Sequence, residues 1–188
     1  AALHLSLASK GFKRGSKFIV PNYTFVSTIE CGEYAGMEPV LVDSDPHGFN
    51  IDLNHVEDIL KKEKNIKAII PVHYGGSPVD MKNIFELAER YGLFVLEDAA
   101  HALESTSSAG KVGNTDHGAA FSFYANKNLT TFGEGGALAT NDDDLAHSVK
   151  NLSLHGITKD GWKRFDSGGK WEYDIIQLGY KYNMPDIS

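Results

Sequence analysis

Short apolar runs alternate with amphipathic segments between residues 17 and 100. The runs at 17–21, 38–43, 66–74 and 93–100 are rich in Val, Ile, Leu and Phe and predict buried strands. Apolar residues recur with helical spacing over 24–36, 52–63 and 80–92, and the last of these segments begins at Asp80 and stops at Gly92. This alternation predicts βαβ units and an α/β fold with a mainly parallel sheet covered by helices.

The pattern changes after residue 110. Two short apolar segments, 118–124 and 136–141, predict strands on either side of a loop that contains Lys127. Residues 142–156 predict a helix, and the polar, glycine-bearing stretch 157–173 predicts a surface loop. The sequence starts within a helix-like pattern and stops near a second one, so we expect it to be part of a longer protein.

Length and composition fit a soluble globular fold. The 188 residues are 41% hydrophobic and 23% charged, enough for one sizeable domain or a large part of a bigger one. The formal net charge of -7 argues against nucleic acid or an anionic membrane as the main partner, and no apolar run reaches spanning length. Cys31 is the single cysteine, so no internal disulfide can form and a reducing, cytoplasmic setting is expected.

Asp98 stands at the carboxyl end of the predicted strand 93–100, where ligands bind in parallel sheets. One interpretation is a capping carboxylate for the turn that follows, and the other is a partner for a buried cation. Glu97 faces the opposite side of the strand and is expected to be structural.

Lys127 is either a solvated loop lysine or an amine placed for chemistry. The strand before it would hold it at a sheet end, and Gly133, Gly135 and Gly136 allow the backbone to fold tightly around a bulky group. Ser122 adds a hydroxyl that could reach an anion. A desolvated lysine becomes a nucleophile toward aldehydes.

Asp98 and Lys127 together suggest a pyridoxal phosphate site. That cofactor needs a lysine for covalent attachment and a carboxylate at its pyridine nitrogen. His101 could lie against one face of the ring and Phe25 against the other. Two other interpretations remain equally open: His101 could be a structural histidine, and Phe25 could be a core aromatic residue.

Several blocks of the sequence resemble, in order, those of the DegT/DnrJ/EryC1/StrS family of sugar-nucleotide aminotransferases. The resemblance spans essentially the whole chain and is carried by VPNYTFVSTIECGEYAGMEPVLVDSDP, PVHYGGSPVDM, LFVLEDAAHALES, FSFYANKNLTTFGEGGALATND and GYKYNMPD. It implies an aspartate-aminotransferase-like large domain of fold type I and transfer of an amino group, usually from glutamate, to a keto carbon of a nucleotide-linked deoxysugar. The histidine of EDAAH and the GYKYNMPD block resemble the branch that aminates a UDP-linked keto-pentose.

The resemblance also implies roles for individual residues. Lys127 would carry the cofactor and shuttle protons, Asp98 would face the pyridine nitrogen, and Phe25 and His101 would sandwich the ring. Ser122 and the backbone amide of Ala1 would bind the phosphate. Asn183 would reach the cofactor of a neighbouring subunit, which implies a homodimer with shared active sites.

The sequence also departs from the family pattern. The Gly-Thr or Ser-Thr pair that usually precedes AALHL is absent, and Asn126 stands where a threonine or another small residue is common. The family's remaining N-terminal segment and its smaller C-terminal domain are missing as well. We therefore expect residues 1–188 to hold most of the cofactor-binding large domain but not a complete substrate site.

Other functions fit the sequence less well. A pyridoxal phosphate sugar dehydratase would replace the lysine by histidine or need an iron–sulfur cluster, which one cysteine cannot hold. A non-catalytic sugar-binding or regulatory module is disfavoured because Asp98, Lys127 and Ser122 are all present. A P-loop is excluded by the absence of its motif, and the eight histidines show no metal-ligand spacing, so no metal is expected.

Overall fold

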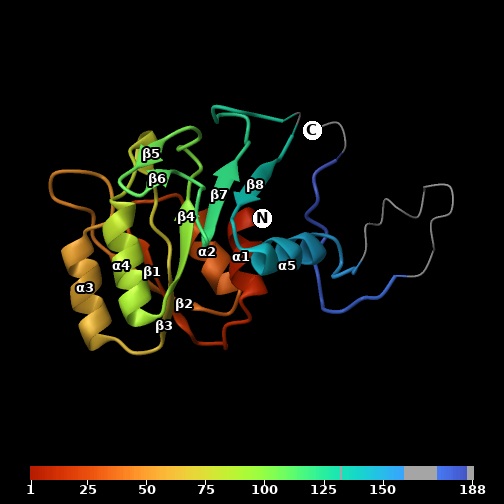
Figure 1. Cartoon of the computed structure of the whole chain (residues 1–188), viewed down its shortest axis with the longest axis horizontal. Helices are drawn as coiled ribbons and strands as arrows, with labels where there is room; N and C mark the ends of the chain where they lie inside the picture. Colours follow the sequence, from red (N-terminus) through yellow and green to blue (C-terminus); the bar gives the residue numbers. More distant parts are fainter. Residues whose placement is uncertain (132, 159–172, 186–188) are drawn as a thin grey trace.

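The computed structural model describes residues 1–131, 133–158 and 173–185. Six strands form one sheet in the order β2-β1-β3-β4-β7-β8 (Figure 1). Every pairing from β2 to β7 is parallel, and β8 runs antiparallel to β7. The strands are β1 (Lys17–Pro21), β2 (Glu38–Val42), β3 (Ile66–Ile69), β4 (Phe94–Asp98), β7 (Gly118–Ser122) and β8 (Gly136–Ala139). The predicted mainly parallel sheet is confirmed.

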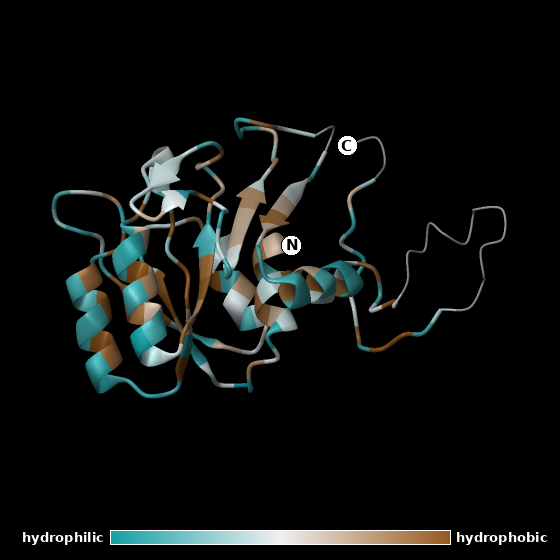
Figure 2. Cartoon of the chain, in the orientation of Figure 1, coloured by the Kyte–Doolittle hydropathy of each residue, from teal (hydrophilic) through white to brown (hydrophobic). Residues whose placement is uncertain are grey.

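Helices cover both faces of this sheet. On one face lie α3 (Leu53–Lys62) and α4 (Met81–Tyr91), and on the other lie α1 (Ala2–Ser9), α2 (Ser27–Tyr34) and α5 (Asp143–Ser153) (Figure 1). Figure 2 shows the apolar stripes of α3 and α4 alternating with hydrophilic outer surfaces. The smaller elements are the 3-10 helix η1 (Tyr74–Gly76) and the hairpin of β5 (Thr106–Ser107) and β6 (Gly110–Lys111).

Strand alternation divides the core into two layers. In β1, Ile19 packs with the residues under α3 and α4, whereas Phe18 and Val20 pack under α1, α2 and α5. In β4, Val95 and Leu96 divide in the same way, and both are fully buried. Burying such a side chain contributes about 1.5–3 kcal/mol. These two apolar layers fix the sheet and therefore the edge at which its strands end.

The predicted helix boundaries were correct to within a few residues, but one cap differs. Gly92 has a left-handed backbone (φ 66°) and terminates α4 as expected. Asp80 stands at the N-cap position without making a side-chain cap bond. Its carboxylate instead accepts hydrogen bonds from Asn83 Nδ2 (2.6 Å) and Ser108 Oγ (2.6 Å), while Ser108 Oγ accepts from the backbone N–H of Lys82 (3.1 Å). A residue of the β5–β6 hairpin therefore caps this helix.

The predicted strand 66–74 was too long. β3 ends at Ile69, and the chain continues through an isolated bridge between Val72 and Asp98 into η1, where Gly75 and Gly76 both have positive φ. The predicted surface loop at 157–173 lies mostly outside the described residues. None of the helices in the described ranges is long and apolar enough to cross a membrane.

Candidate active site

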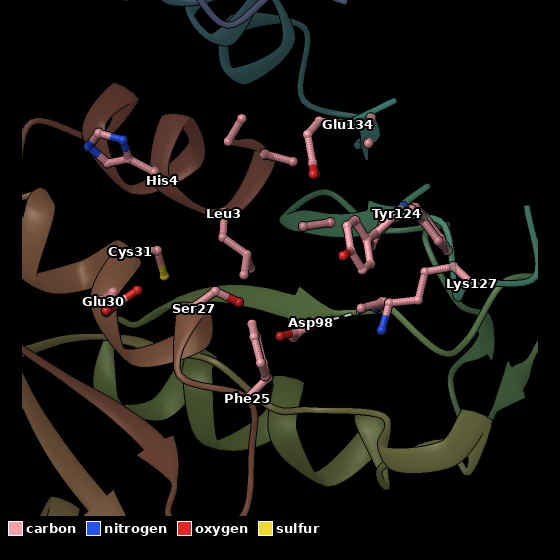
Figure 3. Close-up of a pocket in the computed structure, with 18 of the residues that line it drawn as sticks. Leu3, His4, Phe25, Ser27, Glu30, Cys31, Asp98, Tyr124, Lys127 and Glu134 are labelled. Carbon is pink, nitrogen blue, oxygen red and sulfur yellow. Dashed lines mark hydrogen bonds between the residues drawn. The ribbon is translucent and has the colours of Figure 1, made fainter. Parts of the chain in front are cut away.

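The carboxyl ends of β1, β3, β4 and β7 meet at one edge of the sheet, because these strands are parallel neighbours. The loops that follow them surround a cavity of about 1420 Å³ (Figure 3). Its lining includes every residue that the sequence singled out for the cofactor: Ala1, Phe25, Asp98, His101, Ser122, Lys127 and Asn183. Such an edge is where ligands bind in open α/β sheets.

Asp98 lies at the end of β4 and is only 6% exposed. Its Oδ1 accepts a hydrogen bond from the backbone N–H of Ala100 (3.1 Å), and its Oδ2 accepts one from Thr28 Oγ1 (2.7 Å). Oδ1 therefore supports the turn after the strand, as the capping interpretation predicted, while the carboxylate still lines the cavity. A buried carboxylate needs charged partners or hydrogen bonds to offset the free-energy cost of removing it from water. Here two neutral donors supply the hydrogen bonds.

Lys127 is partly buried at the cavity wall, on the loop between β7 and β8. Its Nζ lies 3.0 Å from Nε2 of His101, and His101 Nδ1 accepts a hydrogen bond from the backbone N–H of Gly75 (3.3 Å). The backbone N–H of Lys127 donates to the carbonyl of Tyr124 (2.9 Å), which forms the turn that carries the amine. The structure thus brings Lys127 and His101 into direct contact, which the sequence did not predict.

The other predicted cofactor residues surround the same space. Phe25 is 76% exposed, so it is no core aromatic residue, and its side chain lies at the cavity near Asp98 (Figure 3). Ser122 closes β7, and its Oγ accepts from the backbone N–H of Tyr124 (3.3 Å). Ala1 occupies the N-cap position of α1, where unpaired backbone N–H groups favour anions.

Asn183 belongs to the described segment 173–185 and lines the cavity of its own chain. Its Oδ1 accepts from Nζ of Lys181, and its Nδ2 donates to the carbonyl of Met184 (3.3 Å). The side chain is exposed. Its predicted contact with a neighbouring subunit stays a prediction.

Sequence reasoning missed two tyrosines of the cavity wall. The hydroxyls of Tyr23 and Tyr74 lie 3.0 Å apart, their ring centroids lie 4.7 Å apart, and Phe49 stacks on Tyr23 at 5.5 Å. The hydrogen bond with Tyr74 raises the pKa of Tyr23. A signal was present, because both tyrosines lie shortly after strands whose carboxyl ends border the site: Tyr23 after β1, which ends at Pro21, and Tyr74 after β3, which ends at Ile69.

Three further buried residues belong to this region: His73 and Cys31 line the cavity, and Glu97 contacts His73. Nε2 of His73 lies 2.9 Å from Oε2 of Glu97, and Nδ1 of His73 accepts a hydrogen bond from the backbone N–H of Val79 (3.1 Å). Because Nδ1 is an acceptor, Nε2 carries the proton of the neutral ring and donates to Glu97. Glu97 is thus bound to His73, and as the neighbour of Asp98 in β4 its side chain points to the opposite face of the strand. Burial raises the pKa of the Cys31 thiol from 9.0 to about 12.

These residues fit a pyridoxal phosphate cofactor. A buried carboxylate and a lysine amine line one cavity, with a hydroxyl and a helix N-terminus available for a phosphate. The cavity exceeds the roughly 300–1,000 Å³ of common small-molecule sites, so it has room for more than the cofactor. No group of three or more His, Cys, Asp or Glu side chains in the described part of the chain is arranged to hold a metal ion.

Comparison with known proteins adds independent observations. The model of the DegT/DnrJ/EryC1/StrS aminotransferase family matches residues 1–188. The chain is 45% identical over 187 residues to the uncharacterized protein MJ1066 of Methanocaldococcus jannaschii, covering 100% of this chain and 48% of that protein. It is 44% identical over 187 residues to the spore coat polysaccharide biosynthesis protein SpsC of Bacillus subtilis, covering 100% and 47%.

Solved structures agree with the sequence matches. NtdA of Bacillus subtilis, with bound cofactor PMP, superposes with a TM-score of 0.81 at 28% identity, covering 97% of this chain and 39% of NtdA. The architecture is therefore that of the fold type I aminotransferases, as the sequence predicted. The chain spans about half the length of the curated relatives it matches.

Proposed function

The chain belongs to the DegT/DnrJ/EryC1/StrS aminotransferase family, and from this premise we propose that it is the cofactor-binding part of a pyridoxal phosphate-dependent sugar aminotransferase. The whole protein would move an amino group from glutamate to a keto group of a nucleotide-linked deoxysugar or pentose. The observation that carries the proposal is the presence of the Asp98 carboxylate and the Lys127 amine on one cavity at the carboxyl edge of a parallel sheet.

When bound, the cofactor supplies an electron sink that makes the Cα proton of an amino acid removable. Asp98 holds a proton at the pyridine nitrogen, because a buried carboxylate favours a positive charge beside it. Lys127 would hold the cofactor covalently through its Nζ, and the Nζ that the donor's amino group displaces would then move the proton from the donor's Cα. Ser122 and the backbone N–H of Ala1 bind the phosphate.

The remaining cofactor contacts concern the ring and water. Phe25 is exposed on one side of the cavity and His101 stands beside Lys127, so the two side chains can lie against opposite ring faces. A ring held between them would cover Asp98 and exclude water from the carboxylate. Removal of water strengthens the interaction between the carboxylate and the ring nitrogen.

The proposed substrate class rests on the name of a relative and on the volume of the cavity. SpsC is named for polysaccharide biosynthesis, which fits an amino sugar as product. The cavity of about 1420 Å³ is larger than one cofactor requires. A nucleotide-linked sugar and glutamate, which would use the site in turn, are the proposed substrates.

The organisation of the whole protein is also a proposal. Residues 1–188 would form most of the large domain, with a smaller domain outside them, as the half-length coverage of the relatives supports. A homodimer with shared active sites, in which Asn183 reaches the partner's cofactor, would complete the site. A cytoplasmic setting fits the single, buried cysteine.

The deciding experiment is the visible absorption spectrum of the purified full-length protein with pyridoxal phosphate, before and after glutamate. We expect a yellow protein that bleaches when glutamate is added. Lys127→Ala should bind no cofactor covalently, whereas Lys111→Ala, on the exposed β5–β6 hairpin, should behave as the wild type. A protein that stays colourless with added cofactor would instead favour a sugar-binding or regulatory module.

A further inference from the structure

A short chain of hydroxyl groups ends on the Asp98 carboxylate. Thr28 is fully buried (0% exposed) in the first turn of α2, and its Oγ1 donates to Asp98 Oδ2 at 2.7 Å. Thr24 Oγ1 lies 2.8 Å from Thr28 Oγ1. A hydroxyl has one proton, and that of Thr28 is used on Asp98, so Thr24 is the donor of the second bond. Both protons therefore point toward the carboxylate.

The carboxylate is fixed at both of its oxygens. Oδ1 accepts from the backbone N–H of Ala100, and Oδ2 accepts from Thr28, so rotation of the carboxylate would break one bond or the other. The ion pairs among the described residues include none to Asp98. Neutral donors thus hold this buried charge, and hydrogen bonds to a charged group are the stronger kind.

Thr28 also supports the segment that presents Phe25. Its backbone N–H donates to the carbonyl of Phe25 at 3.1 Å, so one residue contacts both Asp98 and the chain that carries Phe25. The side chain and the backbone act separately here. A substitution that removes only the hydroxyl leaves the Phe25 contact in place.

We propose that Thr28, assisted by Thr24, is a positioning residue that keeps the Asp98 carboxylate aimed at the cofactor's pyridine nitrogen. This inference rests on the proposed function, because it assigns a role toward the same cofactor. The two hydroxyls fix the direction in which the carboxylate points. Thr28 itself does not have to touch the cofactor.

The test compares Thr28→Val, Thr28→Ser and Thr24→Val in the full-length protein. Valine keeps the shape of threonine without the hydroxyl, and serine keeps the hydroxyl. Thr115→Val is the matched control, since Thr115 is also buried and its Oγ1 accepts from the backbone N–H of His117 (3.1 Å), outside the cavity lining. The readouts are the Kd for pyridoxal phosphate, and kcat and KM for glutamate.

We expect Thr28→Val to raise the Kd for pyridoxal phosphate and lower kcat, each roughly tenfold to a hundredfold. KM for glutamate should stay within about twofold, because Asp98 acts on the cofactor and not on the donor. Thr28→Ser should restore both values to near wild type. Thr24→Val should give a smaller loss of about threefold, and Thr115→Val should leave the Kd unchanged.

Two results overturn this inference and leave the proposed function intact, because in both the wild type binds pyridoxal phosphate. In one, Thr28→Val binds the cofactor as tightly as the wild type does. In the other, Thr115→Val loses as much affinity for the cofactor as Thr28→Val does. If Thr28→Val does not fold, Thr24→Val decides, and an unchanged Kd and kcat in that variant would also refute the inference. A wild type that binds no pyridoxal phosphate overturns the proposed function first, and this inference with it.

Discussion

Nε2 of His101 lies 3.0 Å from Nζ of Lys127. The other ring nitrogen, Nδ1, accepts a hydrogen bond from the backbone N–H of Gly75, which fixes the orientation of the ring. The contact between Nε2 and Nζ therefore holds the Lys127 amine in place at the cavity wall.

We predict that His101→Phe slows the uptake of pyridoxal phosphate by the cofactor-free, full-length protein roughly tenfold. Phenylalanine keeps a ring beside Tyr74 but offers no nitrogen to Lys127. The measurement is the rate at which cofactor absorbance appears after mixing. His101→Gln retains a hydrogen-bonding group and should be within about threefold of wild type. Equal rates in His101→Phe and the wild type would contradict the prediction.

Asp98→Asn should separate cofactor binding from turnover. The amide oxygen can still accept from Thr28, but the amide nitrogen cannot accept from the backbone N–H of Ala100, and the negative charge beside the ring nitrogen is lost. We expect bound cofactor to remain detectable while turnover with glutamate falls at least about a hundredfold. Absorbance titration and single-turnover kinetics measure the two quantities. Turnover within tenfold of wild type would show that the carboxylate is not the ring's partner.

Gly32→Ala should destabilise the fold without touching the site. A Cβ at Gly32 would lie 2.2 Å from the ring of Phe18, which is fully buried in β1 and cannot move away. Such overpacking costs about 1–3 kcal/mol, measurable as a lower urea midpoint. Gly48→Ala is the control, because no atom lies within 4 Å of its added Cβ. If both variants unfold at the same urea concentration, α2 packs less tightly on β1 than the structure shows.

Cys31 should make stability fall at alkaline pH. The unfolded chain loses its thiol proton near pH 9.0, whereas burial raises the pKa of the folded thiol to about 12. Between these values the unfolded state binds fewer protons, so raising the pH lowers the free energy of unfolding. The stability that the protonated thiol contributes is fully present below pH 9.0 and is lost as the pH rises from 9.0 to about 12.

The measurement is the difference in the free energy of unfolding between wild type and Cys31→Ala at about pH 8 and about pH 10. Other groups that titrate at high pH contribute equally to both proteins, so their effect cancels in this difference. We expect the difference in the free energy of unfolding to be smaller at the higher pH. A constant difference would mean that the thiol titrates alike in both states.

Much of the fold could be predicted because its signals are local. The apolar runs of β1 and β4 and the periodicity of α3 and α4 are properties of adjacent residues, and they gave both the elements and the double covering of the sheet. Asp98 and Lys127 were found for a related reason. Each is a polar residue at the end of an apolar strand or in the loop after it, and the family resemblance supported both.

The contacts within the site could not be predicted, because they depend on register and loop shape. Thr28 and Asp98 are separated by 70 residues in the sequence, and nothing in the local pattern of α2 distinguishes this threonine from an ordinary first-turn residue. The contact between His101 and Lys127 depends in the same way on how β4 and β7 align. The dimeric role of Asn183 stays a prediction.

The cap of α4 has a consequence for the order in which the chain folds. The backbone N–H of Lys82 is satisfied by Ser108, which is 26 residues further along, and Asp80 is held by the same hydroxyl. During synthesis, therefore, the first turn of α4 lacks this partner until residue 108 has left the ribosome. The cap of α4 is therefore completed only after β4 and β5 have been made.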